Sequence, residues 1–156
     1  MESGDNNHPP RQSVHKVLAY SYLTYFLFLL IGVCLDLIFN LKVFSSSAVV
    51  YFGYLFLILG TLLVFWAQKT SRHLNIENVT KETFCHGPYR YTRSPTHWGV
   101  FFLTLGFGMI VNAFFIIVFS FISFLITKFT FLSKEEKILA EKYGAPYLEY
   151  KKLVKF

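Results

Sequence analysis

The chain has 156 residues, enough for one domain, and 54% of them are hydrophobic, 20% aromatic and only 15% charged. Soluble domains carry about 25% charged residues. This deficit excludes an ordinary globular surface and indicates that lipid surrounds most of the protein. The net charge of +6 comes from basic residues that flank apolar segments. That pattern favours contact with anionic lipid headgroups over binding of nucleic acid.

Four apolar segments follow one another along the chain. After a polar tail over residues 1–16, which we predict to be disordered, the expected membrane spans cover residues 17–39, 48–67, 96–111 and 113–132. The first two can cross about 30 Å of hydrocarbon at 1.5 Å per residue, whereas the third is short and needs Thr96 and His97 to reach the interface. The last two pivot at Asn112 and predict a helical hairpin. The predicted fold class is therefore all-α, an integral membrane bundle of four transmembrane helices.

Two polar segments connect or follow these spans. Residues 68–95 contain Gly-Pro and Ser-Pro pairs and predict a loop. Residues 133–156 begin with a charged stretch, in which Ser133 and Glu136 fit a capping box at a helix start. Gly144 is expected to end that helix. The stretch predicts either an interfacial amphipathic helix or a continuation of the fourth span.

The basic residues also predict the orientation of the protein. Four spans place the N-terminal tail, the 68–95 loop and the C-terminal segment on one side of the membrane, and these carry all of the 15 lysines and arginines except Lys42. Basic residues gather on the cytoplasmic side of membrane proteins. We therefore expect both termini and the polar motifs to be cytoplasmic. Asp36, near the other end of the first span, is expected to be a solvated interfacial acid.

Two motifs on this polar side have a recognisable order. The first is His86-Gly-Pro-Tyr-Arg-Tyr-Thr-Arg-Ser-Pro-Thr-His-Trp-Gly99, before the hairpin. The second, after it, is Glu135-Glu136-Lys-Ile-Leu139 followed by Tyr143-Gly144-Ala-Pro-Tyr147-Leu-Glu-Tyr150. Over about residues 60–155 the sequence resembles the isoprenylcysteine carboxyl methyltransferases and the related membrane phospholipid methyltransferases. The resemblance implies S-adenosylmethionine as methyl donor, held at the 68–95 loop beneath a lid formed by residues 133–156. It also implies a lipid-tailed or prenylated substrate that enters from the bilayer.

The resemblance further implies roles for individual residues. The cofactor site would be made by Lys81, Glu82, Thr83, Phe84, Tyr89, Ser94, Pro95, Thr96, His97 and Glu135. Glu135 would bind the amino end of the cofactor, because a carboxylate suits its α-ammonium group. The helix N-terminus after Pro95 suits its carboxylate, and aromatic side chains suit its adenine and sulfonium. The residues expected at the reacting groups are Arg93, His97 and Glu136.

The sequence departs from the family pattern at three positions. Ser94 stands in place of the usual His in Arg-His-Pro, and His97 in place of a Tyr. Phe131 stands where an Arg precedes the glutamate pair. The substrate site implied by the resemblance would then use Lys128, one turn further back, which can extend toward the interface. Tyr147 and Tyr150 would complete it.

Several alternatives stay open at this point. The acceptor is either a carboxylate of isoprenylcysteine type, which the glutamate pair and tail favour, or a phospholipid amine. A non-catalytic membrane protein that binds a lipid or a partner is the third possibility. In that case Arg90 and Arg93 only anchor a helix at the membrane surface, the glutamates only favour a helix start, and the lid tyrosines form an aromatic belt. No metal site is predicted, and the oligomeric state is left open.

Overall fold

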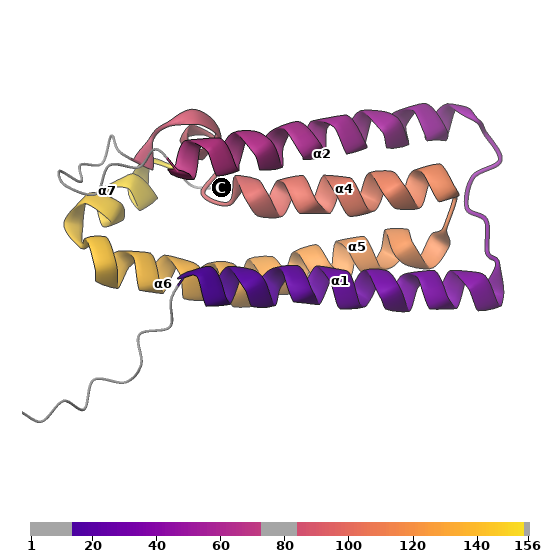
Figure 1. Ribbon diagram of the computed structural model, residues 1–156, viewed down its shortest axis with the longest axis horizontal. Coiled ribbons are helices and arrows are strands. Elements are labelled where there is room, and N and C mark those ends of the chain that lie inside the picture. Colours follow the sequence, from indigo (N-terminus) through magenta and orange to yellow (C-terminus); the bar gives the residue numbers. More distant parts are fainter. Residues whose placement is uncertain (1–13, 73–83, 155–156) are drawn as a thin grey trace, which may run out of the picture.

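The computed structural model describes residues 14–72 and 84–154, and within them it contains helices and no β-strand. The predicted all-α class is therefore confirmed. Figure 1 shows four long helices side by side and antiparallel: α1 (Val14–Phe39), α2 (Ala48–Arg72), α4 (Pro95–Val111) and α5 (Phe114–Ile126). The short 3-10 helix η1 (Gly87–Arg90) precedes α4. After α5 the chain continues through the π-helix η2 (Thr127–Phe131) into α6 (Leu132–Tyr143), and α7 (Ala145–Leu153) follows.

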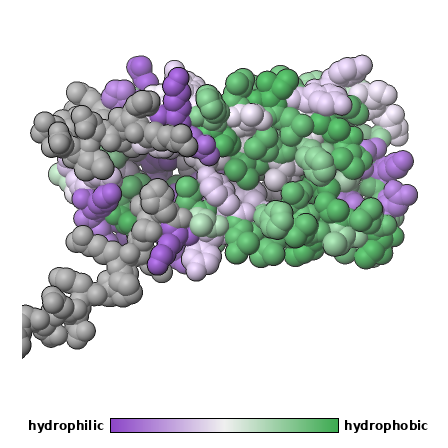
Figure 2. Space-filling view, viewed as in Figure 1, coloured by the Kyte–Doolittle hydropathy of each residue, from purple (hydrophilic) through white to green (hydrophobic). Residues whose placement is uncertain are grey.

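The surface of the bundle suits a bilayer. Three helical segments have the length and hydropathy to cross a membrane, Lys16–Phe39, Ala48–Ser71 and Phe114–Tyr143, and Pro95–Val111 is a shorter apolar helix. Large apolar side chains of α1 and α2 are exposed, and Figure 2 shows apolar residues over the middle of the bundle with polar residues toward its ends. Such a surface is stable only against lipid. The protein is an integral membrane protein.

Some helix boundaries differ from the prediction. The first helix begins at Val14, inside the segment predicted as a disordered tail, and α2 runs on to Arg72, into the predicted 68–95 loop. The capping box at Ser133 is wrong, because the helix is continuous there and the Ser133 hydroxyl donates to the Phe129 carbonyl at 3.3 Å. A residue inside a helix has no free N–H groups ahead of it to cap. The alternative prediction, a continuation of the fourth span, is confirmed, and Gly144 ends α6 with a φ of 64°.

Glycines bring α2 and α4 into close contact. A Cβ atom on Gly60 would lie 2.7 Å from the Gly99 carbonyl oxygen, and one on Gly106 would lie 2.7 Å from that of Gly53. Both pairs therefore lie on one seam between antiparallel helices. Small residues let membrane helices approach at the backbone. Gly53 and Gly60 therefore serve close helix contact, and the seam holds α4 against α2.

Two polar side chains organise the opposite end of the bundle. Asn112, with a φ of 55°, ends α4, and its side-chain oxygen accepts hydrogen bonds of 3.0 and 2.9 Å from two N–H groups of the 40–47 connection. Asp36 accepts hydrogen bonds of 3.0 and 2.9 Å from two N–H groups in the first turn of α5. An anionic side chain stabilises a helix N-terminus. Asp36 is therefore a cap for a neighbouring helix rather than a merely solvated acid.

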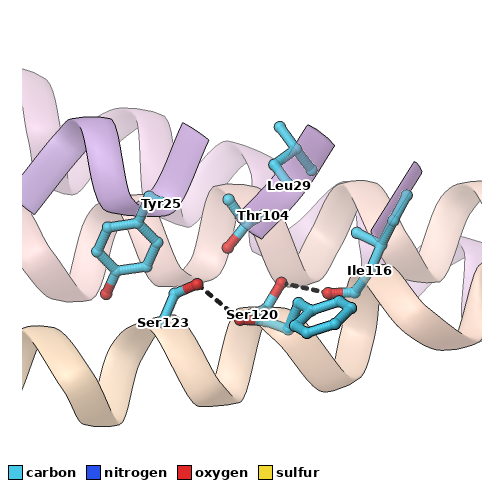
Figure 3. A pocket seen from close by; sticks show the side chains of 7 residues that line it. Tyr25, Leu29, Thr104, Ile116, Ser120 and Ser123 are labelled. Atoms are coloured by element: carbon cyan, nitrogen blue, oxygen red, sulfur yellow. Dashed lines mark hydrogen bonds between the residues drawn. The ribbon is translucent and has the colours of Figure 1, made fainter. Parts of the chain in front are cut away.

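A row of small polar residues on α5 faces α1 and α4. Ser120 and Ser123 are buried, and each donates a hydrogen bond to its own helix, to the carbonyls of Ile116 and Phe119 (Figure 3). The space between them and Tyr25 is too narrow for a water molecule. These hydroxyls therefore serve close helix packing. The buried row continues at Thr127, the first residue of η2.

The π-helix η2 decides which side chains of α6 face the bundle interior. At about 100° per residue, an unbroken α-helix would place Lys134 within roughly 20° of Thr127 and Glu136 roughly 180° away. Instead Lys134 is exposed, whereas Glu135 and Glu136 are buried. The wider turn of a π-helix accommodates an extra residue. The extra residue therefore turns both carboxylates inward.

We expect this helix to tolerate the loss of one residue better than the gain of one. Deleting the exposed Thr130 would let η2 become α-helical without changing the face that α6 presents. Inserting an alanine after Thr130 would turn α6 by about 100° and move Glu135 out of the interior. The insertion should lower the free energy of unfolding by about 3 kcal/mol, the scale of disrupting a buried ion pair, and the deletion by less than half of that. Unfolding in detergent micelles measures both, and equal losses, as in a regular α-helix, would contradict the assignment.

Candidate active site

Buried polar side chains gather where η1, the N-terminus of α4 and α6 meet the first turns of α1 (Figure 1). Among them are Ser21 on α1, Thr96 and His97 on α4, and Glu135 and Glu136 on α6. Ser21, Thr96 and His97 come from apolar helices, and the two glutamates come from the amphipathic helix α6. Polar groups so placed at one end of a membrane bundle are costly unless they are paired or bind a ligand.

Glu135 is a buried carboxylate with an oxygen that no described residue satisfies, a setting that suits a cationic ligand. It is 8% exposed, and its Oε1 atom is buried without a hydrogen-bond partner among the described residues. The His97 Nε2 atom is 3.8 Å away, too far for a hydrogen bond. A buried carboxylate oxygen with no donor costs free energy that an ammonium group would recover. The chemistry of this site therefore fits the amino end of S-adenosylmethionine.

Glu136, the next residue, is paired on both oxygens. Its Oε1 atom lies 2.7 Å from Arg93 Nη1, and its Oε2 atom lies 2.7 Å from Lys151 Nζ. Arg93 immediately precedes α4, and Lys151 is on α7. The Glu136 carboxylate therefore connects three segments, and two cations already occupy it.

Hydroxyl groups lie in the neighbourhood of Glu135. The side chains of Tyr89 on η1 and Tyr22 on α1 both interact with the Thr96 side chain, and both phenols interact electrostatically with Glu135. Burial raises the pKa of Tyr89, so its hydroxyl stays protonated and can donate. The backbone carbonyl of Tyr89 accepts a hydrogen bond of 2.7 Å from the Tyr150 hydroxyl. These contacts hold η1 between the helix bundle and α7.

The C-terminal segment packs through an aromatic cluster. The Phe84 ring lies 5.2, 5.5 and 5.6 Å from the rings of Tyr143, Tyr147 and Tyr150. Tyr147 and Tyr150 are 2% and 3% exposed, so neither belongs to a lipid-facing aromatic belt. Burial raises the pKa of both phenols, so they stay neutral. A neutral phenol can be buried without the free-energy cost of desolvating a charge.

The structure brings most of the sequence-predicted residues together. Those that lie in or against the cluster around the glutamates are Phe84, Tyr89, Arg93, Ser94, Pro95, Thr96, His97, Glu135, Glu136, Tyr147 and Tyr150. Lys128, predicted to bind substrate, is exposed on η2, outside the buried cluster. Lys81, Glu82 and Thr83, predicted to bind cofactor, lie outside the described residues.

Sequence reasoning missed the contribution of α1. The Ser21 Oγ atom lies 3.1 Å from His97 Nε2, and the Tyr22 side chain interacts with that of Thr96. The available signal was a hydroxyl group inside an apolar run, close to its polar end. The length of that run drew attention to its role as a span, and the sequence contains no sign that Ser21 contacts His97 on α4.

Comparison with known proteins is consistent with this site. The family model for phospholipid methyltransferases matches residues 48–146, well over half of the chain, from α2 to the start of α7. No curated protein and no solved structure gives a significant match. The matched region contains η1, α4 and the glutamate pair, in the order that the resemblance required. The chain belongs to the phospholipid methyltransferase family of membrane methyltransferases.

Proposed function

We propose that the protein transfers a methyl group from S-adenosylmethionine to a lipid-type substrate at the polar end of its helix bundle. The observation that carries the proposal is Glu135, a buried carboxylate with an oxygen that no described residue satisfies. In this proposal Glu135 binds the α-ammonium group of the cofactor. Membership of a methyltransferase family supports the same chemistry.

The neighbouring groups suit the rest of the cofactor. The first N–H groups of α4, after Ser94 and Pro95, lack partners within their helix and would receive the cofactor carboxylate. The protonated hydroxyl of Tyr89 and that of Thr96 would donate to polar edges, and the Phe84 cluster offers aromatic faces for the adenine. Residues 81–83 precede this cluster in the chain, and we keep them in the proposal as cofactor-binding residues. When bound, S-adenosylmethionine supplies an electrophilic methyl group on its sulfonium.

The state of Glu136 bears on the acceptor. A carboxylate acceptor is ionised near neutral pH and needs no base, whereas an amine must first lose a proton. Glu136 is held by Arg93 and Lys151 on both oxygens, which makes it a clamp rather than a free proton acceptor. Methylation of a carboxylate of isoprenylcysteine type is therefore the function we propose, with His97 positioned at the site and the cation of Arg93 beside it.

The substrate would lie between the lid and the bilayer. Tyr147 and Tyr150 would form the lid side of its site, and Lys128, exposed on η2, would reach its carboxylate from the membrane boundary. N-methylation of a phospholipid amine is the second candidate, because the matching family model describes phospholipid methyltransferases. His97 would then accept the amine proton.

The proposed arrangement in the membrane has four spans, with α4 and α5 as a hairpin. Residues 17–156 then form a single domain in which residues 133–156 are the lid. The two ion pairs of Glu136 and the bond from Tyr150 to η1 would hold this lid closed. Both termini and the site would face the cytoplasm, since the basic residues gather at that end.

Orientation can be tested with single cysteines in a background where Cys34 and Cys85 are replaced by serine. We expect Lys42→Cys to react with a membrane-impermeant maleimide applied from outside intact cells. Lys142→Cys, on α6, should react only after the membrane is permeabilised. Labelling of Lys142→Cys in intact cells would overturn the cytoplasmic assignment of the site.

Cofactor binding tests the central proposal. Calorimetric titration of the detergent-purified protein with S-adenosylhomocysteine should give saturable binding. Glu135→Gln should weaken it on the order of tenfold or more, the effect of losing one hydrogen bond between charged groups. Glu141→Gln, which changes an exposed glutamate on the same helix, should leave the affinity unchanged. A folded wild-type protein that gives no saturable heat would overturn the proposal.

The acceptor can be identified by transfer of a labelled methyl group into membrane extract. We expect the label in a lipid-soluble product from which mild base releases methanol, because methyl esters hydrolyse in base and N-methyl groups do not. A base-stable label in the phospholipid fraction would instead establish the amine reaction. If S-adenosylhomocysteine binds but no fraction acquires label, both acceptor assignments are wrong.

A further inference from the structure

The Nε2 atom of His97 has two neighbours on different helices. The Ser21 Oγ atom on α1 lies 3.1 Å away, within hydrogen-bond distance, and the Glu135 Oε1 atom on α6 lies 3.8 Å away, beyond it. Ser21 is fully buried and His97 is 4% exposed. Bulk water therefore does not compete for this nitrogen.

An imidazole nitrogen carries either one proton or one lone pair. If Nε2 carries the proton, His97 donates it to the Ser21 hydroxyl oxygen. If Nε2 carries the lone pair, it accepts the hydroxyl proton of Ser21. In both cases the Ser21 hydroxyl occupies Nε2, so this nitrogen is not available to donate to Glu135. The Glu135 Oε1 atom has no hydrogen-bond partner among the described residues.

We propose that Ser21 is a positioning residue that holds His97 away from Glu135. The Glu135 carboxylate then has no hydrogen bond from His97 and can bind the ammonium group of the cofactor. The inference rests on the proposed function, which assigns a cationic ligand to Glu135. It goes beyond that function, because α1 precedes the residues 48–146 that the family model matches. Part of the cofactor site would thus be built by a helix that lies outside the matched residues.

Ser21 differs from the other buried serines in the partner of its side chain. Ser123 is equally buried, yet its hydroxyl donates to the Phe119 carbonyl one turn earlier in the same helix, at 2.7 Å. Such a bond is the ordinary state of a serine at a membrane helix contact. The Ser21 side chain instead contacts a side chain 76 residues away. Ser123→Ala is therefore a matched control for the loss of a buried hydroxyl.

The test compares two probes that differ at the amino end. S-adenosylhomocysteine has the α-ammonium group, and 5′-methylthioadenosine lacks the whole amino-acid portion. Ser21→Ala frees His97 Nε2 to turn toward Glu135 and form a hydrogen bond with its carboxylate. Calorimetry should then show affinity for S-adenosylhomocysteine reduced on the order of tenfold, with the affinity for methylthioadenosine unchanged. Ser123→Ala should leave both affinities unchanged.

A double-mutant cycle identifies the route of the effect. In a His97→Phe background no imidazole can reach Glu135, so adding Ser21→Ala should cause no further loss of S-adenosylhomocysteine affinity. Additive losses would overturn the inference, as would an equal loss for both probes, which indicates disturbed packing. If Glu135→Gln weakens binding while Ser21→Ala does not, the inference fails and the proposed function stands. If the wild-type protein binds no S-adenosylhomocysteine, the proposed function fails as well.

Discussion

The ion-paired carboxylate of Glu136 is the interaction on which the polar end of the protein depends. It joins Arg93, at the entry to α4, to Lys151 on the C-terminal helix α7, and both contacts are 2.7 Å long. Removing one partner of a buried ion pair leaves an uncompensated charge, which is strongly destabilising. The pairing therefore holds α7 over η1 and keeps α6 in one rotational position. That position determines where the preceding residue, Glu135, points.

Two adjacent glutamates thus have opposite surroundings. Glu136 is satisfied by two cations. Glu135 instead faces the interior, one of its oxygens has no donor among the described residues, and His97 is bonded to Ser21. The first arrangement stabilises the fold, and the second suits the cationic ligand that we propose for Glu135. The π-helix η2 turns Glu135 into the buried polar end of the bundle.

Much of this organisation could be read from residue order. The apolar runs indicated helices, and the resemblance of the two polar motifs to a methyltransferase family implied that Tyr89, Pro95 and the glutamates share a site. The failures have physical causes. Ser133 and Glu136 satisfy the local pattern of a capping box, but the π-helix carries the chain through that point and the partners of Glu136 come from elsewhere. Likewise Asp36 looked solvated, because the helix that it caps lies about eighty residues further along.

The sequence by itself determined the helical membrane architecture, the family and most of the residues at the polar end, because hydropathy, helix-breaking residues and motif order are local properties of the chain. Only the tertiary structure decided that η2 turns Glu135 and Glu136 inward in place of Lys134, that Glu136 is a clamp, and that α1 contributes Ser21. These outcomes depend on which helix faces meet. A shift of one residue turns a helix by about 100°, and no local pattern records that rotation.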